Sequence, residues 1–222
     1  MSSAGAIDAA GRLMTSRLTW AIIAVNARAR CKTRLDAALG QSGRSQLMRR
    51  MLSHVLRVAR AVPAIDEVLV VSPERDSIPR DVNVLRDSGT DLNAAFDAGR
   101  QAALAAGATG LVLLPADLPL LSGADLEQLL VAGRRAGVAI APDRNGSGTN
   151  GLYLSLERGA RMCFAFGPGS RERHEAEARS CGYRAQTVAI PGLQADIDTR
   201  ADYDAVFGMP GAKRAPRIES LP

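Results

Sequence analysis

Two kinds of residue pattern alternate along most of the chain. Short apolar runs, typical of buried strands, occur at 18–25, 68–71, 111–114, 138–141, 152–156 and 187–190, with a weaker one at 82–85. Helical spacing of apolar residues, together with capping residues, predicts helices over 43–62, 92–106, 122–135, 170–180 and 199–207. This alternation predicts an α/β fold with one mostly parallel, Rossmann-like sheet that carries helices on both faces.

Helix-stop and helix-start residues support several of these boundaries. Pro63 and Gly107 follow predicted helices, whereas Ser122 and Ser170 precede others as N-caps. Residues 1–17 lack the apolar core of a secretory signal, so we expect a flexible N-terminal extension. The Pro-containing segment 209–222 is predicted to be a flexible C-terminal tail, which leaves 18–208 as a single domain.

Sheets of this kind bind ligands at the carboxyl ends of their strands, where strand order switches. The loops expected at that edge are 26–34, 86–93, 115–121, 142–150 and 191–198. None of them carries the glycine pattern of a dinucleotide-binding turn or of a P-loop, which disfavours both of those classes. The residues in these loops therefore have to indicate the chemistry individually.

The first of these loops is strongly basic. Of the 28 cationic side chains, 26 are Arg, and one of the two Lys is Lys32, within a cluster formed by Arg28, Arg30, Lys32 and Arg34. A Lys ammonium is a compact point charge, unlike the planar fork of Arg. We interpret Lys32 and Arg34 as catalytic cations for a nucleotide triphosphate; the alternative is that Lys32 arose there by chance.

Acidic residues follow two later segments. Asp117 comes directly after the apolar run 111–114, and Asp196 and Asp198 point to one side of an extended segment. Carboxylates at strand ends suit Mg²⁺, which uses one or two carboxylates plus phosphate oxygens. The alternatives are that Asp117 caps a turn and that Asp198 starts the last helix.

Three further motifs are compatible with an anion site. Segment 142–150 contains Gly146 and Gly148, which either lets backbone N–H groups approach an anion or forms a plain hairpin turn. Segment 166–170 leads into a charged helix, where Ser170 is either a cap or part of an anion site. Asn93 either caps a helix, the interpretation we favour, or contacts a purine edge.

Composition excludes several classes of protein. Cys31, Cys163 and Cys181 form no CxxC pair, and the two histidines, His54 and His174, have no obvious nucleophile beside them. Disulfide scaffolds, zinc sites and Ser/Cys–His hydrolases are disfavoured, and a reducing cytoplasm is expected. We interpret His54 as a hydrogen-bonded residue and His174 as a helix-surface residue. No apolar run is long enough to span a membrane.

The positive charge does not indicate nucleic acid. The net charge is +5, yet aromatic residues make up only 4% of the chain, and the Arg-rich helix 170–180 is interleaved with Glu. Base stacking on aromatic side chains is therefore scarce, and a small polyanion explains the charge equally well.

The order of these motifs resembles one family, the 2-phospho-L-lactate guanylyltransferases of coenzyme F-420 biosynthesis, with their phosphoenolpyruvate- and 3-phospho-D-glycerate-using relatives. The resemblance covers about 20–207. The matching stretches are Lys32-Thr33-Arg34-Leu35, Leu92-Asn93-Ala94-Ala95, Asp117-Leu118-Pro119, Asp143-Arg144-Asn145-Gly146-Ser147-Gly148-Thr149, Phe166-Gly167-Pro168-Gly169-Ser170 and Asp196-Ile197-Asp198-Thr199.

The resemblance implies a nucleotidyltransferase fold and a reaction in which GMP passes from GTP to a small phospho-acid. It implies that Asp117, Asp196 and Asp198 hold Mg²⁺ and that Thr149, Gly167 and Ser170 hold the phospho-acid, with Asn93 and Arg144 as further substrate-binding residues. It leaves room for a homodimer and implies that the product passes to a downstream transferase of the same pathway.

One position departs from the family. Many relatives have Lys where this chain has Asn26. The shorter side chain leaves room for an acid whose phosphate lies farther from its carboxylate, which slightly favours 3-phospho-D-glycerate over phosphoenolpyruvate or 2-phospho-L-lactate.

Two alternatives of other kinds stay open. One is a different nucleotidyltransferase of the same fold, acting on a molybdopterin or a sugar phosphate; those enzymes usually carry a glycine-rich first loop that 24–34 lacks. The other is a non-catalytic phospho-ligand-binding protein, which has no need of three acids at strand ends.

Overall fold

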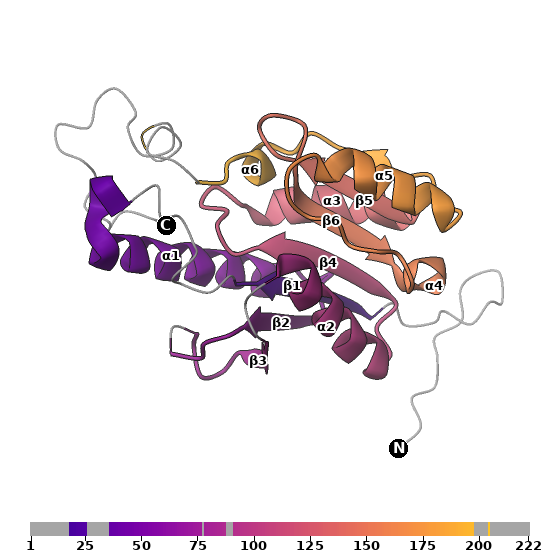
Figure 1. The fold of residues 1–222 in the computed structure, drawn as a ribbon. Coiled ribbons are helices and arrows are strands. Elements are labelled where there is room, and N and C mark those ends of the chain that lie inside the picture. Colours follow the sequence, from indigo (N-terminus) through magenta and orange to yellow (C-terminus); the bar gives the residue numbers. More distant parts are fainter. Residues whose placement is uncertain (1–17, 26–35, 77, 88–90, 198–203, 205–222) are drawn as a thin grey trace, which may run out of the picture.

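A seven-stranded sheet forms the centre of the protein in a computed structural model that describes residues 18–25, 36–76, 78–87, 91–197 and 204 (Figure 1). The strand order is β3-β2-β1-β4-β6-β5-β7. The strands are β1 (Thr19–Ala24), β2 (Glu67–Ser72), β3 (Asn83–Arg86), β4 (Gly110–Pro115), β5 (Val138–Pro142), β6 (Thr149–Ser155) and β7 (Gln186–Thr187). The predicted α/β class with a mostly parallel sheet is confirmed.

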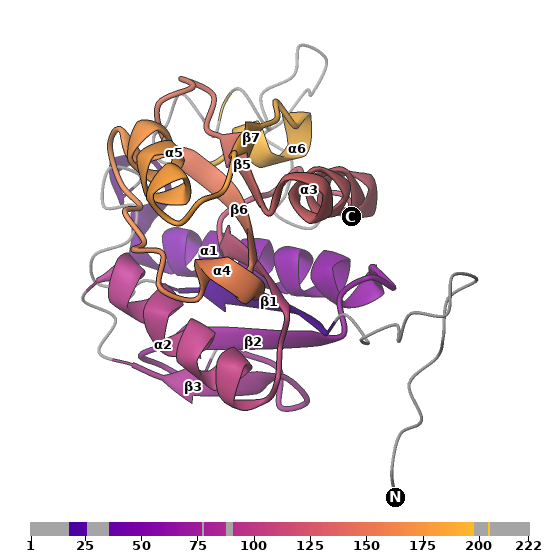
Figure 2. The same cartoon turned by 90° about the vertical axis from the view of Figure 1, so that its right-hand side faces the viewer.

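Helices cover both faces of this sheet (Figures 1 and 2). They are α1 (Asp36–Ala61), α2 (Leu92–Ala105), α3 (Gly123–Ala136), α4 (Leu156–Gly159), α5 (Ser170–Ser180) and α6 (Pro191–Gln194). Residues of α1, α3 and α6 pack into one hydrophobic core, and residues of α2 and α5 pack into the other.

The strands supply alternate side chains to the two cores. In β4, Val112 and Leu114 face the core with α1 and α3, whereas Leu111 and Leu113 face the core with α2 and α5. Because strand side chains point to opposite faces with a period of two, a strand covered on both sides must be apolar throughout. This is why β1, β2 and β4 stand out as continuous apolar runs in the sequence.

One strand runs against its neighbours. β6 pairs antiparallel with both β4 and β5, whereas the other strand pairs in the sheet are parallel. The start of β6, at Thr149, therefore lies beside the carboxyl ends of β4 and β5. Residues that enter β6 consequently reach the edge of the sheet where ligands are expected.

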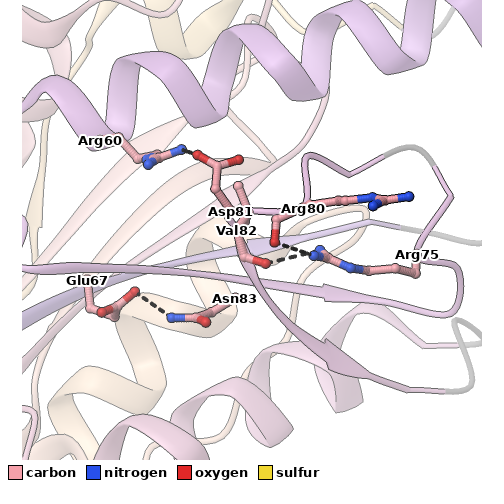
Figure 3. A network of polar contacts seen from close by, with 7 residues as sticks. All are labelled: Arg60, Glu67, Arg75, Arg80, Asp81, Val82 and Asn83. Carbon is pink, nitrogen blue, oxygen red and sulfur yellow. Dashed lines mark hydrogen bonds and ion pairs between the residues drawn. The ribbon is translucent and has the colours of Figure 1, made fainter.

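The edge of the sheet that β3 forms is held by polar contacts with neighbouring segments (Figure 3). Arg60 of α1 contacts Asp81 at 2.6 Å, and Asn83 at the start of β3 donates to Glu67 of β2 at 3.0 Å. Arg75 donates to two backbone carbonyl groups in the segment that leads into β3. These contacts fix a short edge strand with polar ends, and short edge strands resist pairing with other chains.

Several element boundaries differ from the predicted ones. α1 begins at Asp36, seven residues before the predicted start at Gly43, because two helical segments join across Gly40, which adopts a left-handed φ of 64°. β7 is two residues long and exposed, whereas an apolar strand over 187–190 was predicted. The predicted last helix lies outside the described residues apart from Asp204, which is helical.

The two predicted serine caps have opposite outcomes. Ser122 caps α3, as predicted, and the structure adds a capping box with Asp125. The prediction for Ser170 is wrong: the N-cap of α5 is Gly169, with a φ of 69°, and Ser170 is the first helical residue. A glycine in the left-handed region ends the preceding turn there, which shifts the helix start by one position.

Candidate functional site

A cavity of about 490 Å³ opens at the edge of the sheet where β1, β4 and β5 end and β6 begins. Its lining comes from the ends of these strands, from α1, from the β5–β6 hairpin and from the turn that starts α5. A pocket at this position agrees with the rule that such sheets bind ligands outside the carboxyl ends of their strands.

Two predicted metal ligands lie in this cavity. Asp117 follows β4, and Asp196 follows α6, and both line the cavity although 78 residues separate them in the chain. Asp198, the third predicted ligand, lies outside the described residues. Among the described residues no group of three His, Cys, Asp or Glu side chains converges. Two carboxylates in the lining of one cavity fit a hard divalent cation that takes its other ligands from water and phosphate.

The β5–β6 hairpin forms another part of the lining. Oδ1 of Asp143 accepts hydrogen bonds from the backbone N–H groups of Ser147 and Gly148, both at 2.9 Å. Gly146 adopts a positive φ of 70°, and a Cβ on Gly148 would lie 2.7 Å from Oδ2 of Asp143. The segment is thus a hairpin turn, the plainer of the two alternatives, and it also lines the cavity. The N–H groups of Ser147 and Gly148 are directed at Asp143, and binding of an anion by this turn stays a prediction.

Thr149 and Asn150 begin β6 and line the cavity with buried side chains. Nδ2 of Asn150 has no hydrogen-bond partner among the described residues. The predicted substrate residue Arg144, at the tip of the hairpin, is exposed and is not part of the lining.

The start of α5 faces the same cavity. Gly167 and Ser170 both line it, and Ser170 is fully buried with a hydroxyl that has no partner among the described residues. The N–H of Arg171 bonds to the carbonyl of Ser147 at 3.0 Å, which joins the helix start to the hairpin. An orphaned buried hydroxyl at a helix N-terminus is the environment that an anionic group would satisfy.

His174 is a buried residue, and its interpretation as a surface residue is wrong. It is 0% exposed, Nδ1 lies 3.0 Å from Oγ1 of Thr149, and Nε2 lies 3.0 Å from the backbone nitrogen of Ala165. Burial lowers the pKa of His174 to about 4, with a smaller contribution from Arg173. One signal was present in the sequence: Ser170, His174 and Ala178 recur every four residues, and they form the buried face of α5.

Asn93 does not cap α2. The cap is Asp91, whose Oδ1 accepts from the N–H of Asn93 at 2.9 Å. The Asn93 side chain instead spans the backbone of Phe166, because Oδ1 accepts the Phe166 N–H at 2.6 Å and Nδ2 donates to the Phe166 carbonyl at 3.3 Å. Asn93 is not part of the cavity lining, but it binds the turn over 166–169, which does line the cavity.

Aromatic packing supports the same turn. The ring centroid of Phe166 lies 4.5 Å from that of Phe96 and 4.7 Å from that of His174. The ring centroids of Phe164 and Phe96 are 6.3 Å apart. Arg100 stacks over the ring of Phe164 at 4.7 Å. Aromatic contacts of this kind add to area burial and fix ring positions, so the segment before Ser170 is anchored from α2.

The predicted catalytic cations lie outside the described residues. Lys32 and Arg34 belong to segment 26–35, as do Arg28, Arg30 and Asn26. The sequence reasoning missed the contribution of α1, which supplies Ser45, Met48 and Arg49 to the lining. Their spacing of three and four residues marks one helix face, and this was the signal available.

The arrangement combines two carboxylates with buried hydroxyl and amide groups around one cavity. Carboxylates can hold a cation, whereas hydroxyl groups and a helix N-terminus favour phosphate or carboxylate oxygens. A site of this composition suits a metal-assisted reaction of a phosphorylated substrate.

The family comparison decides which class of enzyme this is. Residues 19–215 match the family model described as "Guanylyl transferase CofC like". The chain belongs to this guanylyl transferase family. This family member is therefore a nucleotidyltransferase, and the alternative of a non-catalytic ligand-binding protein is disfavoured.

Individual relatives agree with the family assignment. A phosphoenolpyruvate guanylyltransferase of Sphaerobacter thermophilus is 36% identical to this family member over 194 residues, which is 86% of the chain and 93% of the relative. A nucleotidyl transferase from Methanothermobacter thermautotroptrophicus shares the fold, with a TM-score of 0.62 and 18% identity over 86% of this chain and 96% of that one.

A second solved structure shares the fold more distantly. It is a Mycobacterium tuberculosis protein in complex with manganese, with a TM-score of 0.55 and 20% identity over 87% of this chain and 100% of that one.

Within the described residues of this family member, no helix combines the length and the hydropathy that crossing a bilayer requires.

Proposed function

We propose that the protein transfers GMP from GTP to a small phosphorylated organic acid and releases pyrophosphate. The observation that carries the proposal is the cavity in which Asp117 and Asp196 line the same space as Thr149 and Ser170. One part of this set suits the cation that accompanies a nucleotide triphosphate, and the other suits an acid anion.

The reaction is a substitution at phosphorus. A phosphate oxygen of the acid attacks the α-phosphorus of GTP, the new O–P bond forms, and the bond to the β-phosphate oxygen breaks so that pyrophosphate leaves. A phosphate monoester is largely ionised at neutral pH, since its second pKa is about 6. The attacking oxygen therefore needs no strong general base, which agrees with the absence of histidine among the described residues that line the cavity.

In this proposal the protein aligns two anions and neutralises their charge. Asp117, Asp196 and Asp198 hold Mg²⁺, which would neutralise charge on the triphosphate when bound. Lys32 and Arg34 contact the phosphates of GTP. Thr149, Gly167 and Ser170 hold the phospho-acid, so that its phosphate is kept in line with the α-phosphorus.

Phosphoenolpyruvate is the acceptor that the relatives favour. The Sphaerobacter thermophilus protein carries that name and aligns with most of this chain. The argument from Asn26 favours 3-phospho-D-glycerate instead, and 2-phospho-L-lactate is the third candidate. The guanylylated product contains a diphosphate bridge, an activated phosphoanhydride, which suits consumption by a downstream transferase of coenzyme F-420 biosynthesis.

One competition assay tests the reaction and the acceptor together. The protein is incubated with GTP, Mg²⁺ and equal amounts of the three acids, and the products are identified by mass. We expect pyrophosphate and one dominant guanylylated acid, which we predict to be that of phosphoenolpyruvate. Absence of pyrophosphate release with every acid would overturn the proposed reaction, whereas another dominant product would change only the acceptor.

Two variants test the assigned residues. Asp117→Asn is expected to lower pyrophosphate release at least about 100-fold while the protein stays folded, because it removes a charge at the nucleotide. The matched control is Glu127→Gln on the exposed face of α3.

Lys32→Arg is expected to lose most turnover, because a planar fork cannot follow the phosphates as a point charge does. Its matched control is Lys213→Arg, at the only other Lys of the chain.

A further inference from the structure

The protonation of His174 is fixed by the backbone beside it. The N–H of Ala165 can only donate, and it points to Nε2 of His174 at 3.0 Å. Nε2 must therefore accept, so a neutral ring carries its single hydrogen on Nδ1. Burial keeps the ring neutral at neutral pH, since the pKa of His174 is lowered to about 4.

This tautomer determines what the neighbouring hydroxyl can do. The Nδ1–H group of His174 donates to Oγ1 of Thr149 over 3.0 Å. A hydroxyl oxygen that accepts this hydrogen bond keeps its own hydrogen for a different partner. For the Thr149 hydroxyl, the bond to His174 is the one hydrogen bond formed within the described part of the chain.

Thr149 borders the cavity and is only 7% exposed, so the partner for its O–H has to come from the cavity. We propose that His174 is a positioning residue that makes the Thr149 hydroxyl a hydrogen-bond donor toward the anion bound there. The chain of donors runs from the Ala165 N–H to His174, and from His174 to Thr149. This inference rests on the proposed function in taking that anion to be the phospho-acid.

The rest of the surroundings holds the ring in this orientation. His174 lies one turn after Ser170, the first residue of α5. Its ring packs edge-on against Phe166, with 4.7 Å between the ring centroids. Phe166 is in turn held by Asn93 through both backbone groups. A ring flip would exchange Nδ1 with Cδ2 and Nε2 with Cε1, so ring carbons would face Thr149 and Ala165 and both hydrogen bonds would be lost, which the buried site disfavours.

The other histidine provides an internal reference. Nε2 of His54 lies 2.8 Å from the carbonyl oxygen of Leu121, and Nδ1 lies 3.0 Å from a guanidinium nitrogen of Arg57. A carbonyl only accepts and a guanidinium only donates, so His54 carries its hydrogen on Nε2. The two histidines of the chain therefore hold opposite tautomers.

The tautomer can be measured without any substrate. Long-range ¹H–¹⁵N correlation spectra of the folded protein distinguish protonated from unprotonated ring nitrogens, and His54→Gln assigns the remaining signals to His174. We expect a protonated Nδ1 and an unprotonated Nε2 for His174, and the reverse pattern for His54. A protonated Nε2 at His174 would overturn the inference whatever the enzyme catalyses.

Paired substitutions then test the consequence for binding. In His174→Gln the terminal amide reaches the position of Nε2, keeps an acceptor for Ala165 and loses the donor to Thr149. In His174→Asn the amide nitrogen occupies the position of Nδ1 and keeps that donor. We expect Gln to raise the KM for the phospho-acid about tenfold, the size of a lost hydrogen bond to a charged group, with the KM for GTP unchanged.

His174→Asn is expected to retain a KM for the phospho-acid within about threefold of wild type, although it lowers the melting temperature because the Ala165 N–H loses its acceptor. A merely structural role predicts the opposite, namely that Asn and Gln raise both KM values together in proportion to the lost stability. That outcome would overturn the inference.

A double variant closes the test. Thr149→Val removes the hydroxyl and is expected to raise the KM for the phospho-acid by itself. Adding His174→Gln to Thr149→Val should cause no further increase, because the hydroxyl through which His174 acts is gone. Additive effects would overturn the positioning role.

If the wild-type protein transfers GMP to no phospho-acid, the proposed function fails, and the spectra still decide the tautomer.

Discussion

The side chain of Asn93 forms a pair of hydrogen bonds with the backbone of Phe166, 73 residues away in the chain. The amide accepts at 2.6 Å and donates at 3.3 Å, so it replaces the partner that a neighbouring strand would offer. The turn over 166–169, which lines the cavity, is thus attached to the first turn of α2.

We expect Asn93→Ala to raise the KM for the phospho-acid about tenfold, because the turn that carries Gly167 and Ser170 loses both of its hydrogen bonds to α2. Asn93→Asp keeps the acceptor and loses the donor, so its KM for the phospho-acid should lie between those of the wild type and of Asn93→Ala. Steady-state kinetics with GTP in excess measure both.

The control for Asn93 is the true cap of the same helix. Asp91→Ala removes the N-cap of α2 and should lower the free energy of unfolding by about 1 kcal/mol. It leaves the contact with Phe166 in place, so the KM for the phospho-acid should stay near the wild-type value. Equal kinetic effects of the two variants would contradict the role given to Asn93.

Stability should depend on pH through His174. The pKa of this residue is lowered from 6.5 to about 4 in the folded protein, chiefly by burial. Between these two values the unfolded chain binds a proton that the folded protein does not, so the free energy of unfolding falls as the pH falls from 6.5 to about 4. The total loss is about 3 kcal/mol.

Chemical denaturation at several pH values measures this dependence. His174→Gln carries no titrating ring, so its curve should lose that part of the slope, and the difference between the two proteins isolates His174 from the carboxylates. Parallel curves for wild type and variant would contradict a neutral, buried His174.

Two glycines of α3 should respond to alanine in opposite ways. A Cβ on Gly133 would overlap the ring of Tyr153, which is buried in the core. Although alanine is the better helix former, we expect Gly133→Ala to lower the free energy of unfolding by about 1–3 kcal/mol through overpacking.

Gly123→Ala is the matched control, since the nearest atom to its Cβ is Cγ2 of Val62 at 3.8 Å, an ordinary contact. This variant should be neutral or up to about 1 kcal/mol more stable. Thermal and urea unfolding of both variants measure the difference, and a stabilised Gly133→Ala would show that Tyr153 can move aside.

The hairpin should depend on one carboxylate oxygen. Asp143→Ala removes the acceptor for the N–H groups of Ser147 and Gly148, so their amide hydrogen exchange should accelerate several-fold. Asp143→Asn retains a side-chain oxygen at the same position and should exchange at close to the wild-type rate. Similar exchange in all three proteins would mean that the turn holds its shape without this residue.

The sequence predicts the sheet well where burial is two-sided. β1, β2 and β4 are apolar in consecutive positions because their side chains enter two cores, and this pattern has few alternatives. β7 has two exposed residues and no such constraint, so its bounds were missed. The start of α1 was missed because the break at Gly40 looks like a helix boundary, while the chain continues helical on both sides of it.

The candidate site was partly predictable for the same kind of reason. Asp117 and Thr149 come to one cavity because each lies at a strand end on the same edge of the sheet. His174 was misjudged because the buried face of α5 consists of small or polar residues, which carry no hydrophobic signal among charged neighbours. Asn93 was misjudged because Asp91 is an equally good cap, and only the tertiary contact with Phe166 distinguishes them.

The reversed direction of β6 has a consequence for how substrate preference can change in this family. Thr149 pairs with Pro142 of β5 at the start of β6, whereas Asp143 to Gly148 form a surface turn. Insertions and replacements in that turn can reshape the mouth of the cavity while the donors at its base keep their coordinates. Under the proposed function, the turn would shape the entrance for the acceptor, while Thr149 at the start of β6 would bind it.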